Sequence, residues 1–165
     1  MGFVMRGRFR DGLAGGAGPA GETAWRDNLI VYRSLDLMAE LLAGRPGLGG
    51  PLYWAVGRGD PAWDAAPPSA DPRARRLVDE LFRKPLEAGR DVRYDPATKT
   101  LELRVSFGPG EAVGTLREFG VFAGNATGAP GSGYLINYVA HAAVDKAPAQ
   151  VLERTLQLVF GPGGQ

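Results

Sequence analysis

Apolar and polar residues alternate along two segments in the second half of the chain. From Leu101 to Phe107 every second residue is apolar and the residues between them are polar. Residues 152–160 alternate in almost the same way, with Leu156 and Leu158 in the apolar series. Because successive side chains of a strand point to opposite faces, both segments are predicted to be strands with one buried and one hydrated face.

Three further apolar runs are predicted to be strands, and each has glycine or proline close by. They are Leu52–Val56, Thr115–Phe122 and Tyr134–Ala140. The glycine-rich segment 124–133 separates the last two and is predicted to be a long loop. Residues 95–99 are predicted to close a hairpin between Val92–Tyr94 and the strand that begins at Leu101.

Helical spacing of apolar residues is found in two places. The first extends from Thr23 to Ala43 and is followed by Gly44, which is typical of a helix end. Residues 28–32 within it favour β-structure, so a short strand leading into the helix is the alternative. Residues 73–84 are predicted to form a second, short and highly charged helix.

These elements predict an α+β fold, mainly an antiparallel β-sandwich or rolled sheet with one or two helices. The chain contains 25 glycines and 13 prolines, an excess that belongs in loops and termini. Glycine is especially frequent in residues 1–22, which are predicted to form an arm outside the core. Residues 23–161 are then predicted to form a single domain, and residues 162–165 a flexible tail.

The glycine-rich arm is predicted to bind a neighbouring subunit. In an extended chain its aromatic residues lie on one side and its arginines on the other. Such a segment can add as a strand to the sheet edge of a partner. The arm is therefore expected to be dispensable for folding and required for assembly. Its predicted partner-binding residues are Phe3, Met5, Arg6, Arg8, Phe9 and Arg10.

The residue types present argue against several kinds of chemistry. The chain has no cysteine, a single histidine (His141) and no Gly-x-Ser-x-Gly motif. We therefore predict no enzyme activity, no metal site and no cofactor, and we expect His141 at the surface or in an interface. The net charge of +1 does not favour nucleic acid, and no apolar segment approaches the roughly 18 residues of a membrane span. Neither nucleic-acid binding nor membrane insertion is predicted.

Short motifs, which we call the motif series, follow one another in a characteristic order between Asn28 and Phe160. They are Tyr53-Trp-Ala-Val-Gly57-Arg-Gly59, Leu77-Val-Asp-Glu80-Leu-Phe-Arg83, Leu116-Arg-Glu118-Phe-Gly120-Val-Phe122, Gly133-Tyr-Leu-Ile-Asn-Tyr138, Lys146 and the closing alternation from Leu152. This order resembles the N-terminal, particle-attaching domain of bacteriophage tail-fibre (tail-collar) proteins and related small components of phage-tail-like contractile particles. The glycine-rich arm is not part of the pattern.

The resemblance implies a structural, non-catalytic role by protein–protein docking in a phage tail or phage-tail-like particle. Because no long shaft or receptor-binding tip follows, a fibre-attachment, collar or baseplate-periphery connector is expected. Its partners are then other particle subunits and copies of itself, in a virion or particle assembled in the bacterial cytoplasm. Glu80, Arg83 and Glu118 are expected to support the fold, with Arg83 and Glu118 as an ion pair.

An adhesion or carbohydrate-binding module is the alternative function. In such a module exposed aromatic rings stack on sugar rings. Trp63, in a proline-rich loop, is the leading candidate for a glycan or partner contact, and Tyr134 is the second. If Trp63 lies in a concave, exposed patch, glycan binding is favoured; if a neighbouring subunit buries it, assembly is favoured.

Overall fold

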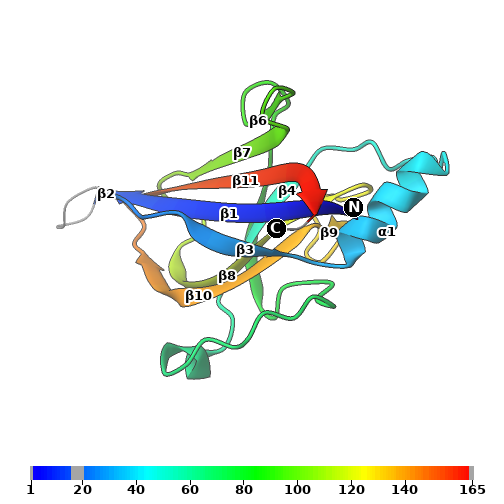
Figure 1. The fold of residues 1–165 in the computed structure, drawn as a ribbon. Coiled ribbons are helices and arrows are strands. Elements are labelled where there is room, and N and C mark those ends of the chain that lie inside the picture. Colours follow the sequence, from blue (N-terminus) through cyan, green and yellow to red (C-terminus); the bar gives the residue numbers. More distant parts are fainter. Residues whose placement is uncertain (1, 16–20, 164–165) are drawn as a thin grey trace.

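The computed structural model describes residues 2–15 and 21–163 (Figure 1). It confirms the predicted α+β class, with a curled antiparallel sheet and, in the described part, one α-helix, α1 (Arg33–Leu42). A short 3-10 helix, η1 (Pro61–Asp64), lies in the proline-rich loop. The strands are β1 (Gly2–Ala14), β2 (Gly21–Glu22), β3 (Arg26–Ile30), β4 (Tyr53–Gly57), β5 (Glu80–Pro85), β6 (Val92–Asp95), β7 (Thr100–Phe107), β8 (Gly114–Ala123), β9 (Tyr134–Leu135), β10 (Asn137–Lys146) and β11 (Val151–Gly163).

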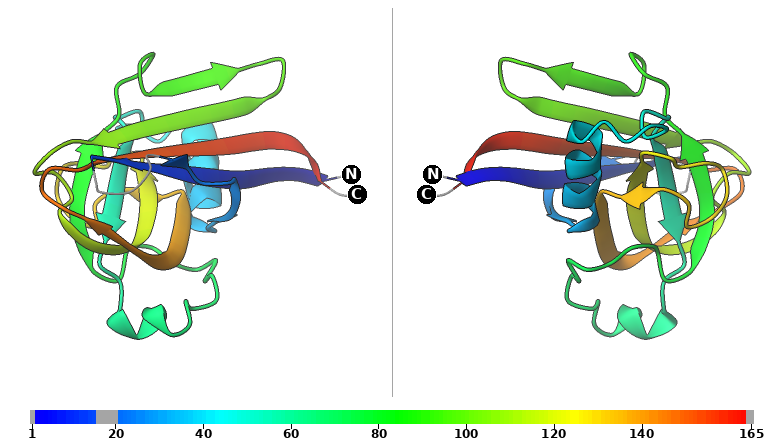
Figure 2. Two further views of the ribbon diagram at one scale, coloured as in Figure 1. Left: turned by 90° about the vertical axis from the view of Figure 1, so that its left-hand side faces the viewer. Right: turned by 90° about the vertical axis from the view of Figure 1, so that its right-hand side faces the viewer.

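The strands follow one another in the sheet in the order β5-β4-β8-β10-β3-β1-β11-β7-β6, with β2 beside β1 and β9 beside β8. The sheet curls until β5, at one end, approaches β7 near the other (Figure 2). Phe82 of β5 and Phe107 of β7 meet edge to face, with 6.0 Å between ring centroids. Lys84 Nζ donates a hydrogen bond to the Ser106 carbonyl at 2.9 Å. Side chains therefore close the roll, and the fold is a rolled sheet rather than a sandwich.

The interior of the roll holds the main hydrophobic core. Phe119 of β8 lies at its centre, with its ring centroid 5.0 Å from that of Phe9 and 5.3 Å from that of Trp54. Aromatic contacts of this kind stabilise a core beyond the burial of apolar area alone. The predicted alternation of the last strand is confirmed, because Leu156 and Leu158 are both buried in this core.

Residues 28–32 follow the alternative that the sequence left open, a strand leading into a helix. β3 pairs with β1 and then with β10, and α1 begins at Arg33. Leu37 on the inner face of the helix packs in a small cluster with Leu48, Ala123 and Tyr134. The helix thus covers one end of the roll (Figure 1).

The predicted helix over residues 73–84 is wrong. Residues 73–79 are irregular, and β5 pairs antiparallel with β4. Leu77 and Phe82 pack in two different hydrophobic clusters, so they do not form one apolar helical face. The backbone N–H groups of Val78 and Asp79 donate to a side chain of β8 rather than to a helical carbonyl.

The prediction of a glycine-rich arm is also wrong, because residues 2–14 form a central strand. β1 pairs with β11 along its whole length and with β3 around Arg8. Phe9 is only 2% exposed, so the apolar side of the strand packs on the chain's own core. Met5 packs against the same core, and Arg6 is exposed. The folded unit therefore includes β1.

β1 and β11 extend side by side beyond the rest of the sheet (Figure 2). Residues 2–6 pair there with residues 159–163, and we call these two segments the terminal ribbon. The predicted flexible tail is corrected in part, since residues 162 and 163 belong to β11. The side chain of Phe3, residues 16–20 of the predicted arm and residues 164–165 of the predicted tail lie outside the described residues.

Candidate interaction surface

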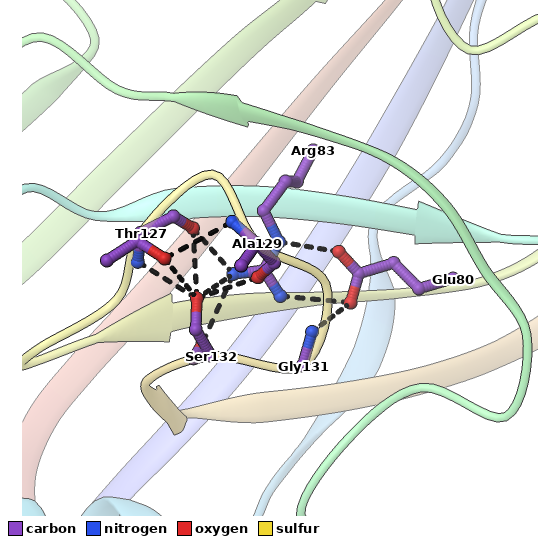
Figure 3. Close-up of polar contacts among 6 residues, drawn as sticks. All are labelled: Glu80, Arg83, Thr127, Ala129, Gly131 and Ser132. Carbon is purple, nitrogen blue, oxygen red and sulfur yellow. Dashed lines mark hydrogen bonds and ion pairs between the residues drawn. The ribbon is translucent and has the colours of Figure 1, made fainter.

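A buried ion pair on β5 faces the glycine-rich loop 124–133 (Figure 3). Arg83 donates through Nε to Glu80 Oε1 at 2.5 Å and through Nη2 to Oε2 at 2.9 Å. The two side chains are 3% and 7% exposed. Two parallel charge-assisted hydrogen bonds fix the guanidinium in one orientation. The Nη1 group of Arg83 is thereby directed at the loop.

The Glu80–Arg83 pair holds the loop from one side (Figure 3). Arg83 Nη1 donates to the carbonyls of Thr127 at 2.9 Å and Ser132 at 3.1 Å, and the Gly131 N–H donates to Glu80 Oε2 at 3.0 Å. The Ser132 hydroxyl accepts a hydrogen bond from the Thr127 N–H at 2.9 Å, which ties the two limbs together. We call residues 124–133 the clamped loop. It is an exposed segment whose shape is set before any partner binds.

Glu118 of β8 is fully buried and shapes a second loop. Its carboxylate accepts hydrogen bonds from the N–H groups of Val78 at 2.9 Å and Asp79 at 2.8 Å, and from the Tyr138 hydroxyl at 2.6 Å. Burial, and next the hydrogen bond to Glu118, raise the pKa of the Tyr138 hydroxyl far above its usual range. A Cβ atom at Gly57 would lie 2.4 Å from Glu118 Oε1, so only glycine fits opposite the carboxylate.

The predicted ion pair between Arg83 and Glu118 is wrong, because Arg83 pairs with Glu80 and Glu118 binds backbone N–H groups. Lys146, another residue of the motif series, is 2% exposed, and its Nζ donates to the Gly108 carbonyl at 2.9 Å. Glu80, Arg83, Glu118 and Lys146 thus each bind the backbone of a loop.

A separate polar cluster lies inside the roll. Arg154 is 1% exposed, with Nε 3.1 Å from Asp11 Oδ1 and Nη2 3.0 Å from His141 Nε2. Because arginine only donates, Nε2 accepts, and the histidine proton sits on Nδ1, 2.7 Å from the Ala142 carbonyl. The Arg154 guanidinium also lies 4.8 Å from the Phe119 ring centroid. The expectation of a surface or interface histidine is wrong, since His141 is buried in this cluster.

Acidification is expected to destabilise the protein through His141. Burial, and next the charge of Arg154, lower the pKa of His141 from 6.5 to about 3. Between these values the unfolded chain binds a proton that the folded chain excludes, so the free energy of unfolding falls as the pH falls. At about 1.36 kcal/mol per pKa unit, lowering the pH to about 4 costs roughly 3 kcal/mol.

Urea unfolding at about pH 7.5 and about pH 4 measures this loss. His141→Gln is the matched variant, because its amide oxygen can accept from Arg154 and does not titrate. It is expected to lose roughly 3 kcal/mol less than the wild type between the two pH values. Equal losses in the two proteins would show that His141 does not carry the pH dependence.

The two aromatic residues predicted to contact a glycan or a partner differ in accessibility. Tyr134 is 3% exposed, its hydroxyl donates to Glu40 at 2.5 Å, and Arg33 lies 4.1 Å from its ring centroid. The prediction for Tyr134 is therefore wrong. Trp63 is half-buried and lines a hollow in the surface, together with Pro68, Ser69, Asp71, Arg76, Val78 and Tyr138.

Trp25 is a surface aromatic residue that the sequence patterns did not single out. Arg8 and Arg10 lie 4.6 Å and 4.8 Å from its ring centroid, and Arg8 Nε donates to Gln157 at 2.8 Å. The alternate spacing of the arginines in β1 correctly predicted that their side chains share one face. The position of Trp25 beside them could not be predicted, because it depends on the pairing of β1 with β3.

In the described part of the chain, no group of three or more His, Cys, Asp or Glu side chains is placed to hold a metal ion. No helix within those residues is long and apolar enough to cross a membrane. Comparison with protein-family models, curated proteins and solved structures found no match for this chain. Function is therefore inferred from the arrangement of its own residues.

Proposed function

We propose that this protein is a structural, non-catalytic component of a phage tail or phage-tail-like particle. It acts by protein–protein docking as a connector at a fibre attachment, a collar or the baseplate periphery. One observation carries the proposal: four charged residues of the motif series, Glu80, Arg83, Glu118 and Lys146, have buried side chains that bind loop backbone. The hydrogen bonds of these side chains hold the loops in place and make the domain a rigid block.

Such a block suits docking, because a loop that is already ordered loses little entropy when a partner binds. The clamped loop is such a segment, because hydrogen bonds from Arg83, to Glu80 and within the loop hold it. Apolar side chains are also exposed on the outer face of α1, where Leu35 is 53% and Leu42 is 90% exposed. Exposed apolar side chains grouped in this way mark protein contacts more often than isolated ones do. Other particle subunits and copies of the same chain are the partners that this proposal implies.

Incorporation into particles tests the proposal. An epitope-tagged chain is expressed in the cell that encodes it, particles are isolated on a density gradient, and tagged sites are located by immunogold electron microscopy. The tagged chain is expected to sediment with tail-like particles and to label one position on them. A chain that stays in the supernatant while complete particles form without it would contradict the proposal.

Two variants, each with one alanine replaced by arginine, locate the docking surface. Ala129→Arg places a long charged side chain on the clamped loop, and Ala97→Arg places the same side chain on the exposed turn between β6 and β7. Both variants are expected to keep the wild-type thermal midpoint. Ala129→Arg is expected to lose at least about tenfold in incorporation, and Ala97→Arg is expected to match the wild type.

Glycan binding is the second candidate function, because Trp63 lines an exposed hollow that also carries polar side chains. An aromatic ring beside hydrogen-bonding groups is the arrangement that stacks on a sugar. A glycan array with the wild type and Trp63→Ala discriminates the two functions. Binding that the substitution removes would favour the glycan-binding role.

A further inference from the structure

We propose that the end of the roll beside α1 is a binding site for a neutral, apolar small molecule. A cavity of about 300 Å³ lies there between the helix and the sheet. Its floor consists of side chains that belong to the buried core. They are Leu37, Leu48, Leu103, Val121, Ala123 and Leu158.

The rim of the cavity joins two elements that lie far apart in the sequence. Met38 and Leu41 come from α1, and Met5 and Phe160 come from the terminal ribbon. Figure 2 shows the helix alongside β1 and β11, whose tips extend past it. Methionine side chains are flexible and polarizable, and they adapt to ligands of different shape. The rim can therefore adjust around an occupant without movement of the sheet.

The lining of the cavity is unfavourable for water. Of the lining residues that the structure describes, only Ser34 has a polar side chain, and the Ser34 hydroxyl already donates to the Val31 carbonyl at 2.8 Å. The N–H of Gly50, another lining residue, is bonded to the Gly124 carbonyl at 3.1 Å. A buried water molecule needs two to four polar partners, and cavities that lack them stay dry or take apolar ligands. The chemistry of the lining therefore selects a hydrocarbon-like occupant.

Size and charge define the class of ligand. An apolar cavity of about 150 Å³ binds benzene, so this cavity has room for a molecule roughly twice as large. A two-ring aromatic hydrocarbon or an alkyl chain of similar volume meets that limit. Among the described residues that line the cavity, none has a charged side chain, so an ionic group would find no partner among them. This site does not depend on the proposed role in a particle.

The test is an isothermal titration calorimetry experiment with the full-length protein and naphthalene, a neutral two-ring hydrocarbon, as the probe. Met38→Trp places an indole at the rim of the cavity, and Leu35→Trp places the same indole on the exposed face of the same helix. The wild type and Leu35→Trp are expected to bind one probe molecule per chain with equal affinity. Met38→Trp is expected to bind at least about tenfold more weakly.

Two further measurements keep the result decisive. Ala123→Leu fills the floor of the cavity rather than the rim, and this variant is expected to weaken binding as Met38→Trp does. Ala123→Leu decides the test if Met38→Trp does not fold.

The probe is also expected to raise the thermal midpoint of the wild type and Leu35→Trp, because the probe binds the folded state alone. Absence of saturable binding to the wild type would overturn the proposal. Equal weakening by Leu35→Trp and Met38→Trp would also overturn it, because the probe would then sit on the outer face of α1.

Discussion

Deletion of residues 2–14 is expected to abolish folding. The deletion removes β1, which lies between β3 and β11, supplies Phe9 to the core and supplies Asp11 to Arg154. It leaves the facing edges of both neighbouring strands without partners for their backbone groups. The combined loss exceeds the roughly 5–15 kcal/mol that stabilises a typical domain. Thermal melts followed by near-UV circular dichroism are expected to show no cooperative transition.

A shorter deletion provides the control. Removing residues 2–4 takes away only the tip of the terminal ribbon, beyond Gly7, where the pairing of β1 with β3 begins. This variant is expected to unfold cooperatively, with a midpoint lowered by a few degrees. If the longer deletion also unfolded cooperatively near the wild-type midpoint, β1 would be an appendage, as its glycine content suggested.

Replacement of Asp11 is expected to have the next largest effect. The Asp11 side chain is 6% exposed and is the carboxylate that faces the fully buried guanidinium of Arg154. Asp11→Ala leaves that charge in the core without its counter-ion, and breaking one partner of a buried pair costs about 3–5 kcal/mol. The midpoint of denaturant unfolding is expected to shift accordingly, with the slope of the transition unchanged.

Two comparisons separate burial of charge from loss of contact. Asp36→Ala breaks an exposed pair with Arg33 and is expected to cost less than about 1 kcal/mol. Asp11→Leu combined with Arg154→Met removes both charges, and the double variant is expected to be more stable than Asp11→Ala. A double variant no more stable than Asp11→Ala would show that packing, rather than the unpaired charge, sets the cost.

The elements predicted well from the sequence are those whose pattern is local. The alternation from Leu101 to Phe107 places Leu103, Val105 and Phe107 in the core, and the hairpin before it forms as predicted. Strand periodicity needs only a few neighbouring residues, so it survives in a chain rich in glycine. The same patterns predicted a sandwich or a rolled sheet, and the choice between the two depends on the contact of β5 with β7, which no local pattern shows.

The failures involve contacts between residues far apart in the chain. Glycine in residues 1–22 predicted an arm, but a Cβ atom at Gly7 would lie 2.3 Å from the Asn28 side chain, so this glycine permits two strands to approach. β1 pairs with β11, and no local sequence pattern predicts pairing between segments so far apart. The same reason explains the missed strand β5, whose preceding segment is ordered by Glu118.

The polar core was partly visible in the sequence. Arg154 interrupts an otherwise apolar series of alternate residues in the last strand, between Leu152 and Leu156. An arginine on the inward side of a strand requires an acid within the core, since unpaired buried charges are very costly. Asp11 is that acid, but its identity depends on the register of β1 and β11, which pairs the two residues directly.

Pairing between β1 and β11 also bears on how the chain reaches its folded state. The register joins Gly12 to Glu153 and Leu13 to Leu152, so the central ladder connects residues at opposite ends of the described chain. Topologies dominated by such distant pairs fold slowly, in milliseconds to seconds. During synthesis β1 leaves the ribosome long before β11, so the edge of β1 that β11 covers stays without its partner in the meantime, although β3 can already pair with the other edge. The arginines of β1 then act as charged gatekeepers that oppose aggregation of nascent chains until the last strand arrives.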